Sequence, residues 1–427
     1  MDKRTLTLIA LAALIMASCR SSSEKQREKT MVIIDPGHFH ASLIEKRLLP
    51  GVSDTVKVYA PEGQELDAYL EMVESFNERN DEPTSWYQDV HSGKDFLSQV
   101  PLAKKGDFVV LAGNNKRKTE YIFDAVSKGY NVLSDKPMAI TPKGYSLLKE
   151  AYSQARKKKL ILLDIMTERY DTLNALARKM ISFDKVIGDT IESVSMVSVH
   201  HFYKKVTGSV LTRPAWYYDV KQQGIGIADV STHLIDLVFW QCFPNVAIEE
   251  SDVTMRNVQT WPTPISLEQY TTSTGERGFP EYLHDAVEDG VLEVLANGRL
   301  DFEVNGVPIS IEIKWNYEAP PSSGDTFEAV YKGNKGSLEI VQDFSTDFVK
   351  QMFLTDKDGK RMLNVPVQSR ESHEDHFNRV ARRFIDFIDG TPVPEWEGVN
   401  TLTKYYITTS AEGDTSSSHS VNSFIQY

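Results

Sequence analysis

Residues 31–42 decide the fold, and they read Met-Val-Ile-Ile-Asp-Pro-Gly-His-Phe-His-Ala-Ser. A short apolar run comes first, a turn with Pro36 and Gly37 follows, and apolar residues then recur at helical spacing over 43–49. A strand without polar alternation is buried on both faces. The stretch therefore predicts a buried strand, a tight turn and a helix, which is how a doubly wound α/β domain begins.

The same alternation of strand and helix continues to about residue 165. Because parallel strands need long crossover connections, and the connections here have helical spacing, residues 31–165 predict a Rossmann-type parallel sheet. Its ligand crevice is expected at the carboxyl ends of the strands. Further apolar runs stand at 56–60, 108–112, 131–133 and 160–163, and helical spacing is found over 66–76, 119–128 and 142–157.

Beyond about residue 190 the strands alternate apolar and polar residues, which is typical of antiparallel sheets with one solvated face. Residues 166–427 therefore predict a second domain with a large, mostly antiparallel open sheet, and the fold class is α/β followed by α+β. The expected strands are 192–203, 291–304, 309–317, 328–331 and 337–341, with a glycine-rich hairpin turn between the last two and closing helices at 371–389 and 399–411.

The composition is that of a globular protein. The chain has 427 residues, of which 41% are hydrophobic and 25% are charged, and this length allows buried cores without disulfides. The net charge of −13 repels a phosphate backbone, so nucleic acid is not an expected partner. Two cysteines, Cys19 and Cys242, are too few for a disulfide framework, and Cys242 is expected to be an inert buried thiol.

The N-terminus has the pattern of an export signal. Two basic residues precede an apolar run at 8–17, which is shorter than the roughly 20 residues that cross a bilayer. The run ends in Met-Ala-Ser-Cys19, which resembles a bacterial lipobox, so residues 1–18 are expected to be removed and Cys19 lipidated. The alternative is a signal peptide whose cysteine is incidental. The polar residues 19–30 then predict a tether at the periplasmic side of the cell envelope.

Three short segments, in chain order, carry the chemistry. One strand ends in Leu-Ala-Gly-Asn-Asn at 111–115, the next continues as Ser-Asp-Lys-Pro-Met at 134–138, and Gly-Ile-Gly-Ile-Ala-Asp-Val-Ser-Thr-His follows at 224–233. In this order and spacing they resemble the Gfo/Idh/MocA family of nicotinamide-dependent sugar and polyol oxidoreductases. The resemblance covers residues 31–341.

The resemblance implies catalytic roles for three residues. The family's Glu-Lys-Pro motif is present as Asp135-Lys136-Pro137, and its later motif with Asp, three residues and His is present as Asp229 and His233. Oxidation of an alcohol needs a base for the hydroxyl proton and a positive group for the alkoxide. His233 is expected to be the base and Lys136 the positive group, while Asp229 orients the imidazole or contacts the substrate. A packed histidine and a structural Asp135 are the alternatives.

Cofactor contacts are expected at the strand ends. The first turn keeps only Gly37 of the Gly-x-Gly-x-x-Gly pattern, with His38, Phe39 and His40 following it, and an ordinary turn is the alternative. A ribose-binding acid is expected about 20 residues after the turn, and Glu62 lies farther along the chain than that. No arginine is placed to bind a 2′-phosphate, so NAD is favoured over NADP. The expected cofactor-binding residues are Gly37, His38, Phe39, His40, Glu62, Asn114, Asn115, Asp135 and Lys136.

Substrate contacts are expected from residues between the motifs. Arg169 matches a family position that often contacts substrate, although a surface arginine is the alternative. His200 and His201 are neighbours on a strand, so they face opposite sides, cannot form one ligand pair, and only one reaches the substrate. Aromatic faces near Trp216 suit a pyranose ring or a subunit interface. The expected substrate residues are Arg169, His201, Tyr203 and Trp216.

No metal site is expected from the sequence. His373 and His376 share one helical face, but further ligands are missing nearby, and Ser372 is a natural helix N-cap, so a helix start is favoured.

These patterns predict an exported NAD(P)-dependent oxidoreductase that acts on a ring hydroxyl of a sugar or glycoside, and the resemblance places the reaction at C3. The alternative is an NAD-dependent glycosidase that oxidises transiently and then eliminates, with Tyr203, His200 and His201 as further acid–base groups. A third possibility, a scaffolding lipoprotein, is disfavoured by the retained motifs. The cofactor is expected to stay tightly bound because the periplasm holds little free dinucleotide. Family members commonly pair, so a homo-oligomer is expected.

Overall fold

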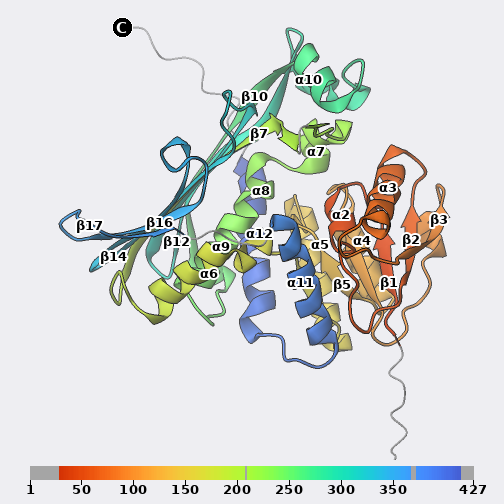
Figure 1. The fold of residues 1–427 in the computed structure, drawn as a ribbon, viewed down its shortest axis with the longest axis horizontal. Helices are drawn as coiled ribbons and strands as arrows, with labels where there is room; N and C mark the ends of the chain where they lie inside the picture. The colour runs from red at the N-terminus through yellow and green to blue at the C-terminus, as the bar shows by residue number, and fades with distance from the viewer. Residues whose placement is uncertain (1–27, 207–208, 367–371, 415–427) are drawn as a thin grey trace, which may run out of the picture.

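The computed structural model describes residues 28–206, 209–366 and 372–414. Figure 1 shows a parallel sheet wrapped by helices on one side of the molecule and a long curved sheet on the other, with helices packed between them. The expected signal peptide and Cys19 lie outside the described residues.

The first sheet is parallel throughout, in the order β3-β2-β1-β4-β5-β6. Strand β1 pairs with β2 on one side and with β4 on the other, so the strand order reverses at β1. Ligands bind at such a reversal in doubly wound sheets. The predicted Rossmann-type sheet is confirmed. Its strands are β1 (Met31–Ile34), β2 (Thr55–Ala60), β3 (Tyr87–Ser92), β4 (Phe108–Leu111), β5 (Asn131–Ser134) and β6 (Leu162–Asp164).

Helices cover both faces of this sheet. Alternate residues of each strand point to opposite faces, and the apolar residues on each face are buried against helices. Met31 and Ile33 share a buried cluster with residues of α3 and α11, and Val32 and Ile34 share another with residues of α4, α5 and α12. The C-terminal helices, grouped by sequence with residues 166–427, therefore complete the core of the first sheet. These helices are α3 (Gln64–Glu78), α4 (Lys118–Ser127), α5 (Pro142–Lys158), α11 (His373–Ile388) and α12 (Glu395–Asp414).

The helix expected over 43–49 is wrong. Helix α2 spans only His40–Leu43, and the chain then continues in tight turns. Pro50 and Gly51, the latter at φ 72°, form a turn directly after the predicted range, where a helix could not continue. The carboxyl of Glu45 turns inward, where Tyr69 and Gln88 donate hydrogen bonds to it.

Buried Glu45 makes stability depend on pH. Burial raises the pKa of its carboxyl from 4.5 to about 7. The unfolded chain loses this proton above pH 4.5 while the folded chain keeps it, so the contribution is full below pH 4.5 and is lost as pH rises through 7. The free energy of unfolding of the wild-type protein should therefore fall between acidic and neutral pH, and Glu45→Gln should remove up to about 3 kcal/mol of this fall. Urea unfolding of the wild-type and Glu45→Gln proteins over this pH range measures the difference. Parallel plots of unfolding free energy against pH would contradict the role of Glu45.

The second sheet is mixed but mostly antiparallel, in the order β10-β12-β13-β7-β14-β15-β16-β17 with β11 beside β12. Among the described strands of this sheet, only β7 and β13 pair in parallel, so the predicted largely antiparallel sheet is confirmed. The predicted hairpin joins β14 to β15, with Gly333 opposite Gly336. The strands are β7 (Ile191–Tyr203), β10 (Val253–Ser266), β11 (Val287–Glu288), β12 (Val291–Val304), β13 (Val307–Glu318), β14 (Thr326–Gly333), β15 (Gly336–Gln342), β16 (Gln351–Asp356) and β17 (Arg361–Pro366); a separate pair is β8 (Lys205–Val206) with β9 (Ser209–Val210).

Short helices lie between the two sheets and position the site (Figure 1). Helix α8 packs against β12 so closely that a Cβ at Gly226 would lie 1.7 Å from the carbonyl oxygen of Ala296. Helix α11 begins at the N-cap Ser372 with a capping box to Asp375, which confirms the predicted helix start. The remaining α-helices are α6 (Thr172–Arg178), α7 (Val220–Gln223), α8 (Gly226–Asp229), α9 (Ser231–Cys242) and α10 (Leu267–Thr274).

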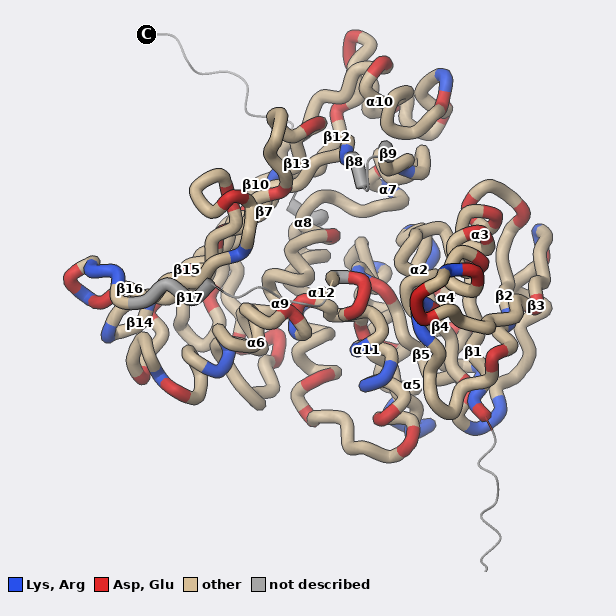
Figure 2. The backbone as a smooth tube through the Cα atoms, viewed as in Figure 1, with Lys and Arg blue, Asp and Glu red and all other residues tan. Residues whose placement is uncertain are grey.

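Acidic and basic residues are interspersed over both halves of the molecule (Figure 2). Among the described helices, none has the length and apolar character needed to span a lipid bilayer.

Candidate functional site

Two neighbouring cavities lie at the carboxyl ends of the parallel strands. The main cavity, of about 530 Å³, lies between the parallel sheet and β7, and the second cavity, of about 640 Å³, lies over the ends of β1 and β2. The two share wall residues, so they form adjoining parts of one crevice on either side of the first turn. The shared residues are His38, Phe39, Arg213, Trp216 and Tyr217.

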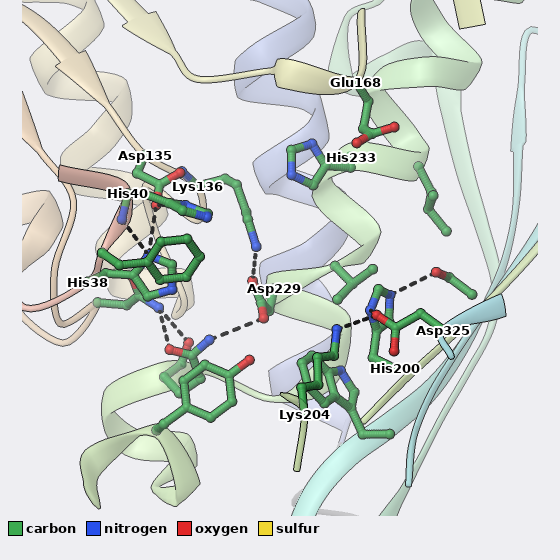
Figure 3. A pocket seen from close by; sticks show the side chains of 18 of the residues that line it. His38, His40, Asp135, Lys136, Glu168, His200, Lys204, Asp229, His233 and Asp325 are labelled. Carbon is green, nitrogen blue, oxygen red and sulfur yellow. Dashed lines mark hydrogen bonds and ion pairs between the residues drawn. The ribbon is translucent and has the colours of Figure 1, made fainter. Parts of the chain in front are cut away.

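The sequence motifs meet in the main cavity. Lys136, which follows β5, forms an ion pair with Asp229 at the end of α8 (Figure 3). Gln223 donates a hydrogen bond of 3.1 Å to the other oxygen of Asp229. Burial alone would lower the pKa of Lys136, but Asp229 and Asp135 together raise it. Lys136 in turn lowers the pKa of Asp229 against the effect of burial. The cavity wall therefore carries a charged pair.

His233 lies one helical turn beyond Asp229, in the first turn of α9, and also lines the main cavity (Figure 3). The structure therefore brings Lys136, Asp229 and His233 to one cavity. The sequence led us to expect Asp229 to orient His233 or contact the substrate, whereas the structure shows it holding Lys136.

A second group of polar side chains lies on the opposite wall of the main cavity, and it comes from β7 and the residues just before β14 (Figure 3). His200 has its Nε2 2.8 Å from Ser198 Oγ and its Nδ1 3.3 Å from Asp325 Oδ2. Lys204 also pairs with Asp325. Burial would raise the pKa of Asp325, yet the hydrogen bonds from the two imidazoles and the charge of Lys204 hold it well below its usual range.

His200 and His201 were expected to face opposite sides of the strand and not to form one ligand pair, yet both reach the same side chain. His201 Nδ1 lies 2.9 Å from Asp325 Oδ1, so both imidazoles contact one carboxylate. Asp325 directly precedes β14, whose residue Thr326 pairs with Val199, and it therefore reaches past the end of the ladder to both histidines. His200 lines the main cavity, whereas His201 is only 3% exposed and lies behind the cavity wall.

The first turn differs from a glycine-rich turn in its charge. Asp35 stands at the first glycine position with φ 51°, and its carboxyl accepts a 3.0 Å hydrogen bond from Tyr121. The N–H of Gly37 donates to Asp35 O at 2.8 Å, and that of His38 donates to Ala112 O at 3.1 Å. Burial raises the pKa of Asp35 and of Glu65, which also lines the second cavity. The turn thus presents carboxyl groups, and two of its N–H groups bond within the chain.

The crevice nevertheless fits a dinucleotide, because its two adjoining cavities lie at the carboxyl ends of the parallel strands. The main cavity would take the nicotinamide half next to Lys136, and the second cavity would take the adenosine half beside Glu62. His38 and Phe39, which line both cavities, lie where the two halves would join. The carboxyl-rich turn is the part of the site where the donor set departs from that of a diphosphate cradle.

Gly113, after β4, permits the close packing of this turn. A Cβ at Gly113 would lie 2.1 Å from Asp35 O and 2.9 Å from Gly37 N. We expect Gly113→Ala to displace the turn and to cost about 1–3 kcal/mol of stability. Gly278→Ala is the matched control because no atom lies within 4 Å of its Cβ position. Urea unfolding of both variants checks this, and equal stabilities would contradict it.

His38, His40 and Asp135 form a compact cluster on the main cavity (Figure 3). His40 Nδ1 lies 2.8 Å and His38 Nδ1 3.8 Å from Asp135 Oδ2. Burial and the neighbouring His40 lower the pKa of His38 well below its usual value, so its imidazole is neutral. No local motif reveals this cluster because 95 residues separate His40 from Asp135.

The two asparagines after β4 connect the parallel sheet to α7. Asn114 Nδ2 donates to Gln222 Oε1 at 2.8 Å, and Asn115 Nδ2 donates to Gln223 O at 2.8 Å. Asn115 lines the main cavity. Its amide oxygen accepts a hydrogen bond from the buried Lys118, whose pKa burial lowers to about 8.

The expected substrate residues divide between the cavities and the core. Trp216 lines both cavities, and its indole N–H donates to Glu65. Arg169 is instead held by buried carboxylates and lies outside the lining of either cavity. Tyr203 stacks on Tyr317, with ring centroids 5.8 Å apart, also outside both linings.

Sequence reasoning missed several residues that line the main cavity. Glu168 precedes α6 and pairs with Lys350, which precedes β16, at 3.2 Å. Asp325, Lys204 and Ser198 were missed as well. Each lies in a segment without a recognisable motif, and only the fold brings them together.

The comparisons with known proteins agree with this architecture. Residues 176–362 and 356–415 match the family described as "Putative oxidoreductase C terminal domain". A crystal structure described as a putative oxidoreductase from Parabacteroides merdae is 36% identical, with a TM-score of 0.88 over 92% of this chain and 98% of that chain. No curated protein matches the chain in sequence.

More distant solved structures share the fold. A structure described as a putative oxidoreductase from Thermotoga maritima is 16% identical, with a TM-score of 0.60 over 91% of this chain and 98% of that chain. KijD10, a 3-ketoreductase from Actinomadura kijaniata in complex with NADP and TDP-benzene, is 13% identical, with a TM-score of 0.58 over 90% of this chain and 96% of that chain. From its matched C-terminal domain, its sequence motifs and its two sheets, the chain belongs to the Gfo/Idh/MocA-type oxidoreductases that carry this C-terminal domain.

Proposed function

We propose that the protein is an NAD(P)-dependent oxidoreductase that oxidises a ring hydroxyl, at C3, of a sugar or glycoside, or reduces the corresponding ketone. The observation that carries the proposal is the charged Lys136–Asp229 pair beside His233 in one cavity at the carboxyl edge of the parallel sheet. The 3-ketoreductase activity of the structural neighbour KijD10 supports this class of reaction.

The chain's own residues divide the proton chemistry between them. His233 accepts the proton of the substrate hydroxyl as its O–H bond breaks. Lys136 stays an ammonium because two carboxylates raise its pKa, so it stabilises the negative charge that develops on the oxygen. The chemistry that a nicotinamide would supply when bound is acceptance of the hydride from the carbon that bears this oxygen, so that a ketone is left. In the reverse direction His233 returns the proton.

Mass spectrometry of products from a panel of glycosides tests the proposal. We expect a product that lacks two hydrogens and keeps its aglycone, and reduction of added keto-glycoside by protein loaded with reduced nucleotide. A panel that gives neither reaction with nucleotide-loaded protein would contradict the proposal.

The second candidate function is an NAD-dependent glycosidase. It needs an acid or base that acts at a neighbouring carbon after oxidation, and His200 with Asp325 offers one on the wall opposite Lys136. In that case the same panel would release free sugar and aglycone. His200→Gln would then stop release while oxidation continues.

Tight retention of the nucleotide belongs to the proposal. The two adjoining cavities would enclose both halves of a dinucleotide. Protein purified without added nucleotide and then denatured should release about one nucleotide per chain into the supernatant. An empty protein that works only with a continuous supply of NAD would contradict retention and favour ordinary exchange.

We also propose export to the periplasm, lipid attachment at Cys19 and assembly of identical chains. Cys19→Ser should lose palmitate labelling and leave the membrane fraction. Light scattering should give a mass above that of one chain.

A further inference from the structure

The first turn and the Asp-Lys-Pro segment place two imidazoles and one carboxylate together. We propose that His38, His40 and Asp135 bind one divalent transition-metal ion of the zinc class, with open coordination positions toward the main cavity. The ligand atoms all lie within 4.8 Å of one another. The assignment rests on these donors alone, so it holds whether or not the protein proves to be a dehydrogenase.

The spacing of the donors suits such an ion. Two ligands about 2.0–2.1 Å from a tetrahedral zinc ion lie roughly 3.3–3.4 Å apart. The distances from Asp135 Oδ2 to the Nδ1 atoms of His40 and His38, 2.8 and 3.8 Å, stand on either side of that value. A sub-ångström shift of one oxygen between the rings would therefore satisfy both. Imidazole and carboxylate are donors that zinc, cobalt and iron accept.

The structure already holds these donors in orientation. Asp135 Oδ1 accepts a 3.0 Å hydrogen bond from the N–H of Lys136, which leaves Oδ2 toward the histidines. The His40 ring packs on Phe377, with centroids 4.5 Å apart. Such supporting contacts fix ligand orientation in known metal sites.

The hydrogen bond that His38 accepts points to the same conclusion. The N–H of His40 donates to His38 Nδ1 at 3.4 Å, so this nitrogen carries a lone pair. Its distance of 3.8 Å from Asp135 Oδ2 is too long for a hydrogen bond. A lone pair and a carboxylate oxygen therefore face each other in a partly buried place, and a cation between them could take both atoms as ligands.

The surrounding charges permit a cation. Lys136 is neutralised by Asp229, and Lys118 donates to Asn115 Oδ1 and to the main-chain oxygen of Asp135 at 3.3 Å. All three ligands line the main cavity. An ion held there would offer its open positions to oxygen atoms of a cavity ligand, beside the turn whose own groups are carboxyls.

Cobalt binding by the full chain tests the assignment. After chelator treatment and addition of Co²⁺, the wild-type protein should retain about one ion per chain, with visible bands of low-coordinate Co²⁺. His38→Ala, His40→Ala and Asp135→Asn should each weaken retention about tenfold or more. His284→Ala is the matched control because its imidazole is exposed and contacts Phe279 O at 3.1 Å, far from the cluster in the chain.

Thermal unfolding gives a second readout that does not depend on catalysis. Co²⁺ should raise the melting temperature of the wild-type protein and of His284→Ala but not of folded Asp135→Asn, because only a native site couples binding to stability. A wild-type protein that retains no cobalt after desalting would overturn the proposal. Retention that is equal in wild-type and Asp135→Asn proteins would overturn it as well.

Discussion

Replacing Lys136 by methionine should lower turnover about a hundredfold or more, because a group that stabilises the developing oxyanion contributes on that order. Methionine keeps the length of the side chain but removes the ammonium. The charge matters here because Asp229 and Asp135 raise the pKa of Lys136 and keep it protonated in the cavity. Single-turnover rates with nucleotide-loaded protein measure the effect directly.

The control must separate catalysis from folding. Without Lys136 the carboxylate of Asp229 would be left buried with Gln223 as its hydrogen-bond donor, which is costly. The double variant Lys136→Met with Asp229→Asn removes that charge and should refold while staying slow. Lys149→Met is the matched control, since Lys149 is half exposed and pairs with Glu250 at the surface. A near-native rate in Lys136→Met would contradict the role.

The sequence predicts best those strands whose burial determines the order of apolar and polar residues. Strands β1, β4 and β5 are buried along their whole lengths, so they appear as apolar runs. Strand β3 was missed because it is an edge strand with half-exposed residues and polar side chains. Helix α2 was expected to be longer because spacing alone does not reveal the inward turn of Glu45.

The same distinction applies to the site. Lys136 and Asp229 lie in local motifs, and their meeting across 93 residues follows from a resemblance that contains both. The partner of His201 lies 124 residues away in a segment without a motif, so Asp325 could not be found. Adjacent histidines were expected to diverge by strand geometry, but Asp325 lies just beyond the last residue pair of β14 with β7, where its two carboxylate oxygens reach both imidazoles.

Arg169 is the residue whose interpretation changes most between sequence and structure. Its guanidinium donates to Asp236 at 2.6 and 2.7 Å and to Glu397 at 2.8 and 2.9 Å. The buried Lys404 joins Asp236 at 3.2 Å and Asp164 at 2.9 Å. Burial would lower the pKa of Arg169, but the two carboxylates raise it. This network joins the end of β6, helix α9 and helix α12.

Arg169→Met should therefore cost about 3–5 kcal/mol of stability, because it takes the guanidinium from two buried carboxylates, of which Asp236 keeps its pair with Lys404. Arg117→Met removes an exposed pair with Glu120 and should cost no more than about 1 kcal/mol. Urea unfolding compares the two variants. Because Arg169 lies outside the lining of both cavities, the KM of folded Arg169→Met protein should stay near that of the wild type. An unchanged unfolding curve with a raised KM would instead support a contact between Arg169 and the substrate. The structural role predicts lower stability with an unchanged KM, and the substrate role predicts unchanged stability with a raised KM.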